Sequence, residues 1–204
     1  MHKEILTKEQ VALLPVVESF RKDFGLVGGT AIAFHIGHRE SIDFDLFSMK
    51  EFDNSKIRRK ILGIVPSIDV TYEEAGQFTM NIGGVKFTFY QYPYPIDFSK
   101  DFEGIIKLPD LLTLAAMKAF ALANRAKWKD YVDLYFILRD HFTVADITTK
   151  ANELFKKEFN ERIFKMQLGW FDDINYIEPI IYRPGYEVPD QIVKDALVEF
   201  SLAK

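Results

Sequence analysis

Cysteine is absent from this chain of 204 residues. Disulfide bridges, thiolate catalysis and cysteine-based zinc sites are therefore all excluded. The chain also lacks an apolar run approaching the ~20 residues that a membrane-spanning helix requires. Its first residues, MHKEILTKEQ, contain no apolar segment of the signal-peptide type. We therefore expect a cytoplasmic protein that has no membrane partner.

A strong positive charge is missing as well. The chain has 26 Lys and Arg against 30 Asp and Glu, which gives a net charge of −4. Nucleic-acid-binding proteins usually carry a strongly basic surface, and this composition does not indicate one. A local basic run remains at residues 56–60, and we interpret it as a solvated helix face. The hydrophobic content of 48% is sufficient for a substantial core, in one domain or in two small ones.

Residues 26–47 form the stretch around which the chain is organised, with the sequence LVGGTAIAFHIGHRESIDFDLF. In its second half, one parity carries Ile42, Phe44 and Leu46, and the other carries polar residues, namely Arg39, Ser41, Asp43 and Asp45. Because a strand sends alternate side chains to opposite faces, we predict a strand with the apolar set in the core. Asp43 and Asp45 would then lie about 6–7 Å apart at Cα, close enough to share a hard divalent cation.

The first half of this stretch predicts a strand-to-helix turn. A short apolar run reaches Gly28 and Gly29, and the residues AIAFHI that follow are typical of a helix. Glycines at such a turn let backbone N–H groups approach a ligand, Thr30 can cap the helix, and a helix N-terminus favours anions. Taken singly, the glycines also fit an ordinary capped turn, and the two aspartates fit a solvated strand. Together they indicate a nucleoside triphosphate bound with magnesium.

The motif GGT-A followed by HRxSxDFDLF resembles the nucleotidyltransferase superfamily, in which a Gly-Gly/Ser motif precedes a D-x-D strand. The segment is most similar to the AbiEii/AbiGii toxin-like family of abortive-infection and type IV toxin–antitoxin systems. The resemblance implies that Asp43 and Asp45 are catalytic and bind Mg²⁺ or Mn²⁺. We expect the nucleotide to contact Gly28, Gly29, Thr30, Arg39 and Ser41.

A second set of candidates lies in the middle of the chain. Residues 111–124, which follow an N-cap at Asp110, predict a buried helix whose one charged residue is Lys118. A lone lysine there must reach solvent or meet an anion. Arg125 would lie on nearly the same face, about 10 Å further along. We expect both to bind nucleotide, and the resemblance implies a catalytic Lys118. Alternatively, Lys118 pairs with a carboxylate that holds the two halves of the chain together.

The segment that follows carries the pattern R-x-K-x-x-D-x-x-D-L, which is similar to the last motif of the AbiEii-like family. The resemblance implies that Asp130 contributes to the catalytic site. On the residues alone, Asp130 and Asp133 would form surface ion pairs on a helix. Residues 170–173 also match a short family pattern, in which we expect the aromatic residues to pack and the two aspartates to turn the chain.

The predicted fold is a mixed α/β (α+β) sheet of the nucleotidyltransferase type, flanked by helices and followed by a helical region. Alternating runs at residues 68–72, 78–82 and 85–91 predict a meander, with Gly83-Gly84 as its hairpin turn. Helices are expected at residues 8–22, with a break at Pro15, and at 54–62. We divide the chain into an α/β core at residues 1–97 and a helical region at 98–204 that packs on the core and completes the site.

One departure from the superfamily leaves two functions open. Many nucleotidyltransferases carry a third carboxylate on the strand beside the D-x-D strand, which completes a two-metal site. The matching segment here, GVKFTFYQYPYP, has no acidic residue. Thr88 or Tyr90 stands in that place, and Asp69 is a candidate substitute. The first interpretation is a magnesium-dependent toxin that moves a nucleotide from an NTP to an acceptor hydroxyl, with RNA or tRNA as acceptor and a separate antitoxin as partner. The second is an NTP-binding module that keeps the fold and has lost catalysis.

Overall fold

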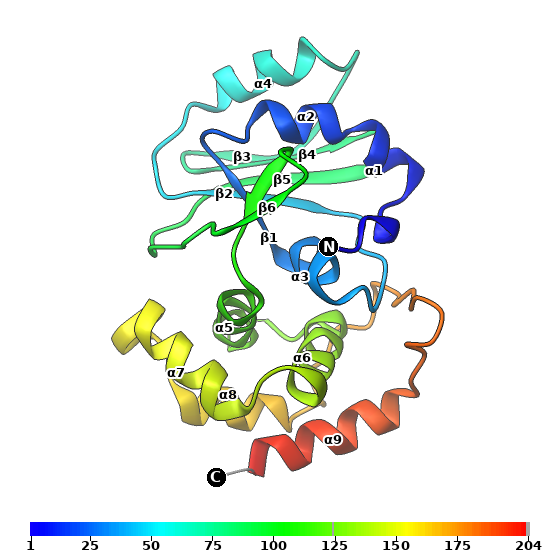
Figure 1. The fold of residues 1–204 in the computed structure, drawn as a ribbon. Coiled ribbons are helices and arrows are strands. Elements are labelled where there is room, and N and C mark those ends of the chain that lie inside the picture. The colour runs from blue at the N-terminus through cyan, green and yellow to red at the C-terminus, as the bar shows by residue number, and fades with distance from the viewer. Residues whose placement is uncertain (124, 203–204) are drawn as a thin grey trace. The chain divides into compact units, whose positions relative to one another are not determined.

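The computed structural model describes residues 1–123 and 125–202 (Figure 1). Contacts within the chain divide it into two compact units, Met1–Asp110 and Leu111–Lys204. The end of the first central helix that we expected at Asn124 lies outside the described residues. The first unit includes a small hairpin at residues 100–108, which contacts residues 25–27. The boundary at residue 97 stays a prediction.

The first unit is built on a mixed sheet, as predicted. Its described strands are β1 (Gly25–Val27), β2 (Phe44–Ser48), β3 (Asp69–Glu74), β4 (Gln77–Ile82) and β5 (Val85–Gln91), in the order β1-β2-β5-β4-β3. Strand β2 is antiparallel to β1 and parallel to β5, and β5, β4 and β3 form an antiparallel meander. The predicted Gly83-Gly84 hairpin joins β4 to β5, and both glycines have a positive φ.

Helices cover the sheet on both sides (Figure 1). They are α1 (Lys8–Ala12), α2 (Leu14–Ser19), α3 (Gly28–Ile36) and α4 (Asn54–Leu62), after a short 3-10 helix at Lys3–Ile5. Thr7 and Gln10 form the predicted capping box of α1, and the helix restarts at α2 with Pro15 in its first turn. Figure 1 shows α2 and α4 on the same side of the sheet. This side includes Phe89 of β5, whose ring lies 4.8 Å from the ring of Phe20 just after α2.

The alternation that predicted β2 holds along its length. Phe44 and Leu46 are fully buried, as are Phe87 and Phe89 beside them on β5. The strand begins at Phe44, however, and Ile42, which we assigned to the core, is 52% exposed. Residues 40–43 adopt an irregular conformation, so the period-two rule does not apply to them. Of the predicted polar row, Asp45 therefore lies in the strand, and the other three residues lie before it.

A second, two-stranded sheet was missed. Strands β6 (Lys100–Phe102) and β7 (Ile106–Leu108) pair antiparallel, and β7 contacts β1. The ring of Phe102 stacks on Phe34 of α3 at 4.1 Å. The strands of the first unit thus continue beyond residues 85–91, the last strand that we predicted.

The second unit is helical, as predicted. Its described helices are α5 (Leu111–Leu122), α6 (Trp128–Asp140), α7 (Val144–Phe155), α8 (Glu161–Leu168) and α9 (Asp190–Leu202), with a 3-10 turn at Lys156–Glu158. In the 170–173 segment, Phe171 packs on Tyr131, the Tyr131 hydroxyl donates to the Trp170 carbonyl at 3.1 Å, and Asp172 and Asp173 form a turn. The packing role that we expected of Phe171 and the turning role of the aspartates are confirmed, but the packing role of Trp170 is wrong, because its side chain is 52% exposed. No described helix has both the length and the apolar character needed to span a membrane.

Candidate functional site

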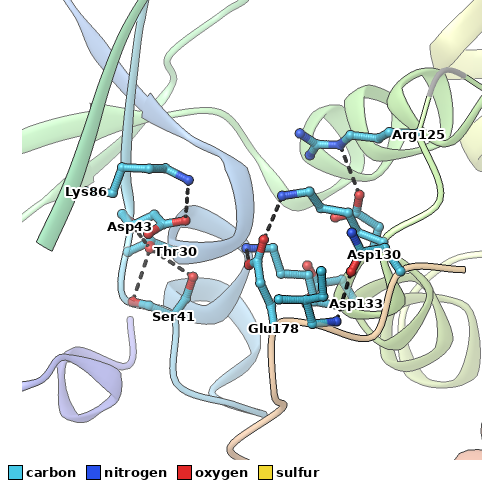
Figure 2. Close-up of polar contacts among 12 residues, drawn as sticks. Thr30, Ser41, Asp43, Lys86, Arg125, Asp130, Asp133 and Glu178 are labelled. Carbon is cyan, nitrogen blue, oxygen red and sulfur yellow. Dashed lines mark hydrogen bonds and ion pairs between the residues drawn. The ribbon is translucent and has the colours of Figure 1, made fainter. Parts of the chain in front are cut away.

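Thr30 anchors the loop that leads into β2. It lies in the first turn of α3 and is 1% exposed. Its hydroxyl lies 3.1 Å from the Ser41 hydroxyl and also contacts the backbone carbonyls of Ser41 and Asp43 (Figure 2). From α1, the Gln10 side chain donates to the same Ser41 carbonyl at 2.8 Å. The helix-capping role that we assigned to Thr30 is wrong, because α3 begins at Gly28 with Val27 as its N-cap.

The two glycines allow charged side chains to approach the start of α3. Gly28 has a φ of +73°, and a Cβ atom there would lie 2.3 Å from Oδ2 of Asp45. A Cβ atom on Gly29 would lie 2.6 Å from a guanidinium nitrogen of Arg39 and 3.0 Å from the Ser41 hydroxyl. Arg39 and Ser41 are themselves buried. The fold therefore brings all the candidates of residues 28–45 together at one corner.

Strand β5 contributes the next residues of this corner. The register places Thr88 directly beside Asp45, where the sequence placed Thr88 or Tyr90. Lys86, two residues earlier on the same face of β5, reaches back to Asp43, with 3.0 Å between its Nζ and Oδ2 (Figure 2). Asp69 is not a substitute for the third carboxylate, because β3 is three strands away from β2, about 14 Å at the usual spacing.

The donor set at this corner suits a hard divalent cation with few protein ligands. Asp43 and Asp45 supply carboxylate oxygens, and magnesium commonly uses one or two carboxylates together with water and phosphate oxygens. Among the described residues there is no group of three or more His, Cys, Asp or Glu side chains that could hold a metal. A site made of protein ligands alone is therefore not formed there, and a site shared with a triphosphate fits the residues present.

The candidates of the second unit form a buried ionic cluster. The Lys118 ammonium lies 2.7 Å from Oδ1 of Asp130 and 2.9 Å from Oδ2 of Asp133. Arg125 approaches the other oxygen of Asp130 at 3.1 Å (Figure 2). Both carboxylates are fully buried, whereas the Arg125 side chain is half exposed. Burial alone would raise the pKa of Asp130, but the adjacent Lys118 and Arg125 outweigh it, so that the pKa is lowered.

This cluster corrects one expectation and resolves part of another. Asp130 and Asp133 are not surface ion pairs, because neither is exposed. Lys118 does pair with carboxylates, and these lie on α6 of its own unit. The pairing therefore joins α5 to α6 within the helical unit. Whether Lys118, Arg125 and Asp130 act on a nucleotide stays a prediction.

Comparison with known proteins decides the family. The family model described as "Nucleotidyl transferase AbiEii toxin, Type IV TA system" matches residues 16–196. This chain belongs to the AbiEii family. The match covers both units, so the resemblance predicted from residues 28–47 extends over most of the protein. Membership in the AbiEii family and the fold support a nucleotidyl-transfer function.

Individual relatives agree with this membership. An uncharacterized protein of Aquifex aeolicus (strain VF5) is 37% identical over 96% of this chain and 97% of its own. The solved structure of MenT4, a nucleotidyltransferase toxin from Mycobacterium tuberculosis, has a TM-score of 0.58 at 11% identity, over 94% of this chain and 81% of that one. JHP933 from Helicobacter pylori also has a TM-score of 0.58, at 14% identity, over 98% of this chain and 90% of that one. These structural likenesses show that the AbiEii chain has the nucleotidyltransferase fold.

Two residues of this AbiEii chain contact the candidate site residues, although the sequence had not selected them as candidates. Asp133 was assigned to the surface although it is a full partner of Lys118. Its signal was the spacing, because Asp130 and Asp133 are one helical turn apart and therefore face the same neighbour. Lys86 lies in a strand that was predicted, but the residue itself was not singled out. The sequence already showed that residues 84–95 contain no acid. A search of the same residues for a cation would have found Lys86, which lies beside Asp43.

Proposed function

We propose that this protein is a magnesium-dependent nucleotidyltransferase that moves a nucleoside monophosphate from an NTP to an acceptor hydroxyl. The observation that carries the proposal is the corner formed by the start of α3 and the start of β2. Two carboxylates lie there: Asp45 approaches Gly28 so closely that a side chain would displace it, and Asp43 pairs with Lys86. A purely structural role does not require acidic groups at such a turn, since like charges repel.

The phosphates would bind at the first turn of α3. The N-terminus of a helix presents unpaired backbone N–H groups and a partial positive charge, both of which favour an anion. Arg39 lies against Gly29 with one guanidinium nitrogen, while another donates to the carbonyl of Glu40 at 2.9 Å. Its burial fixes the position of the charge, so that phosphate oxygens meet a preorganised cation.

The proposed reaction is a displacement at the α-phosphorus of the NTP. The acceptor oxygen attacks the α-phosphorus in line, the bond from the α-phosphorus to the bridging oxygen breaks, and pyrophosphate leaves with that pair of electrons. The hydroxyl proton passes to a base. When bound, the divalent cation neutralises the charge that develops on the phosphates. Because phosphoryl chemistry of this kind needs little covalent help, positioning and charge neutralisation supply most of the catalysis.

The remaining roles rest on family resemblance. Lys118, Arg125 and Asp130 are proposed to assist the transfer, and Lys118 and Arg125 are proposed to bind the nucleotide. The family description refers to a toxin–antitoxin system, and MenT4 is named a nucleotidyltransferase toxin. We accordingly propose an antitoxin protein as a partner and RNA, including tRNA ends, as the acceptor class.

The test is a labelling experiment with matched variants. The protein is incubated with Mg²⁺ and each α-labelled NTP, alone and with total RNA. We expect label on the acceptor with the wild type, and a loss of at least 100-fold, on the order that a lost charge-stabilising group costs, in Asp43→Ala and in Lys118→Ala. Asp69→Asn is the control, because it removes an aspartate from the far edge of the same sheet, and we expect it to transfer like the wild type.

A second function is favoured by a specific observation. Strand β5 has Thr88 beside Asp45 and a lysine beside Asp43, where a catalytic acid would be expected. An NTP-binding module that has lost catalysis would show magnesium-dependent NTP binding that Asp43→Ala abolishes, with no transfer to any RNA. Absence of both transfer and binding would contradict both functions.

A further inference from the structure

Lys86 lies on β5, the strand on which a two-metal nucleotidyltransferase would carry its third acid, two residues before Thr88. Strands β2 and β5 run parallel, with Phe44 beside Phe87 and Asp45 beside Thr88. Extending this register by one residue places Lys86 level with Asp43. Since Lys86 and Thr88 share a parity, both side chains stand on the face of Asp45. The contact of 3.0 Å between the Lys86 ammonium and the Asp43 carboxylate confirms this placement (Figure 2).

The exchange of an acid for a lysine reverses the charge that a cation meets. Three carboxylates would present three negative charges, which two divalent ions can share. Here Asp43 and Asp45 present two, and Lys86 supplies a positive charge next to one of them. A second divalent ion on that side would meet the ammonium at a distance of a few ångströms, where like charges repel strongly.

In this pairing, Lys86 occupies the side of Asp43 that a metal ion would otherwise approach. The Lys86 side chain is 42% exposed and Asp43 is 17% exposed. Because the lysine end of this ion pair is exposed, the pair contributes little to stability. Lys86 follows the Gly83-Gly84 hairpin at the start of β5, and its backbone pairs with Asn81 of β4. The strand therefore keeps its place whatever the side chain does.

We propose that Lys86 acts as a resident cation of the nucleotide site, which competes with a divalent ion for Asp43 and limits the site to a single such ion. The inference rests on the proposed function, since it assumes that Asp43 and Asp45 bind a metal. Lys86 takes the second metal's place on the Asp43 side and supplies a positive charge to the phosphates in its stead. The metal site that lacks the third acid is then altered and not defective.

The test measures metal binding directly, without turnover. The full chain is titrated with Mn²⁺, and free Mn²⁺ is read by electron paramagnetic resonance, first alone and then with an NTP analogue whose α,β-bridge cannot be cleaved. We expect one Mn²⁺ per wild-type chain with the analogue. Lys86→Met should bind Mn²⁺ about tenfold more tightly, on the order expected when one unit charge is removed at a few ångströms. Lys86→Glu should bind more tightly still and take up two ions with the analogue.

Control variants separate this inference from the proposed function. Lys107→Glu makes the same charge change at an exposed strand position in β7, and we expect wild-type Mn²⁺ affinity and stoichiometry. If Lys86→Met and Lys86→Glu bind Mn²⁺ like the wild type while Asp43→Ala loses it, the inference fails and the metal site stands. If Asp43→Ala also binds like the wild type, or no chain binds Mn²⁺, the metal site of the proposed function fails with it. Circular dichroism of each variant verifies that the fold is retained.

Discussion

Gly28 occupies a position where both backbone conformation and space exclude a side chain. Its φ is +73°, and an added Cβ would lie 2.3 Å from Oδ2 of Asp45. Gly28→Ala should therefore displace the Asp45 carboxylate and lower Mn²⁺ affinity by at least about tenfold, the equivalent of one displaced charge interaction. The left-handed conformation itself costs an alanine about 1–2 kcal/mol. Mn²⁺ titration and urea unfolding measure the two effects separately.

Gly104 provides the matched control for this prediction. Its φ is +72°, but nothing lies within 4 Å of an added Cβ. Gly104→Ala should lose a similar free energy of unfolding and bind Mn²⁺ like the wild type. Equal Mn²⁺ affinity in both variants would show that Asp45 is not a metal ligand.

Lys118 joins α5 to α6 through two buried ion pairs. Its side chain is 4% exposed and contacts two fully buried carboxylates. Breaking a buried ion pair leaves charge uncompensated, so Lys118→Ala should lower the free energy of unfolding by about 3–5 kcal/mol. Urea unfolding measures this loss. Lys150→Ala, which removes an exposed pair with Glu153 at 3.4 Å, should change stability by less than about 1 kcal/mol.

A double variant tests the reason for that loss. In Lys118→Ala with Asp133→Asn, one of the two carboxylates left without Lys118 becomes neutral, and part of the lost stability should return. Losses that simply add would contradict the cluster. This result also bears on activity assays, because a loss of transfer in Lys118→Ala is informative only for protein that remains folded.

For single residues, the sequence predicted which residues lie together better than it predicted what surrounds each of them. The candidates of residues 28–45 do lie together at one corner, and their role in binding stays a prediction. Their surroundings were not predictable from periodicity. Thr30 reaches across to the carbonyls of residues 41 and 43, and that contact depends on an irregular segment that no repeat describes. Ile42 is exposed for the same reason.

Among the elements, the segment after α8 depends on charge for its attachment. Glu178 accepts from Lys127 at 2.6 Å and also pairs with Lys129, at the start of α6. Nearby, the backbones of Lys127 and Asn175 form an isolated bridge. Burial of the Glu178 carboxyl would raise its pKa, but hydrogen bonds from Lys127 and Lys129 outweigh burial and lower the pKa to about 2.

This shift predicts how the attachment responds to acid. Because the folded pKa lies below the ordinary value of 4.5, the ion pairs stabilise the fold above pH 4.5 and lose this effect as pH falls toward 2. Glu178→Gln should therefore be less stable than the wild type at pH 7, and the difference should shrink as the pH is lowered below 4.5. Urea unfolding across this range measures it. Glu199→Gln, at an exposed position of α9, should show no such difference at either pH.

Elements with a clear period were predicted, and short ones were not. Strands β4 and β5 alternate over six and seven residues and were placed within about two residues of their ends, the usual uncertainty of such boundaries. Strands β6 and β7 have three residues each, which is too short for alternation to be distinguished from chance. Their pairing is fixed by contacts with β1 and α3, which lie far away in the sequence.

For the whole molecule, the division after Asp110 separates two sets of candidates. Asp43, Asp45 and Lys86 lie in the first compact unit, and Lys118 and Asp130 lie in the second. The first unit has its own core, with Phe44, Leu46, Phe87 and Phe89 fully buried. A unit of this size with its own core is able to fold alone. We therefore predict that a fragment of residues 1–110 folds and binds one Mn²⁺ with an affinity within about threefold of the full chain.

The same fragment should not transfer nucleotide. The resemblance implies that Lys118 and Asp130 take part in the reaction, and the fragment lacks both. Mn²⁺ titration and the α-labelled NTP assay, run on the fragment and on the full chain, check the two halves of this prediction. A folded fragment that does not bind Mn²⁺ would show that ligands come from residues 111–204. Transfer by the fragment would show that Lys118 and Asp130 are not needed for the reaction and would leave their buried pairing as a contact within the helical unit.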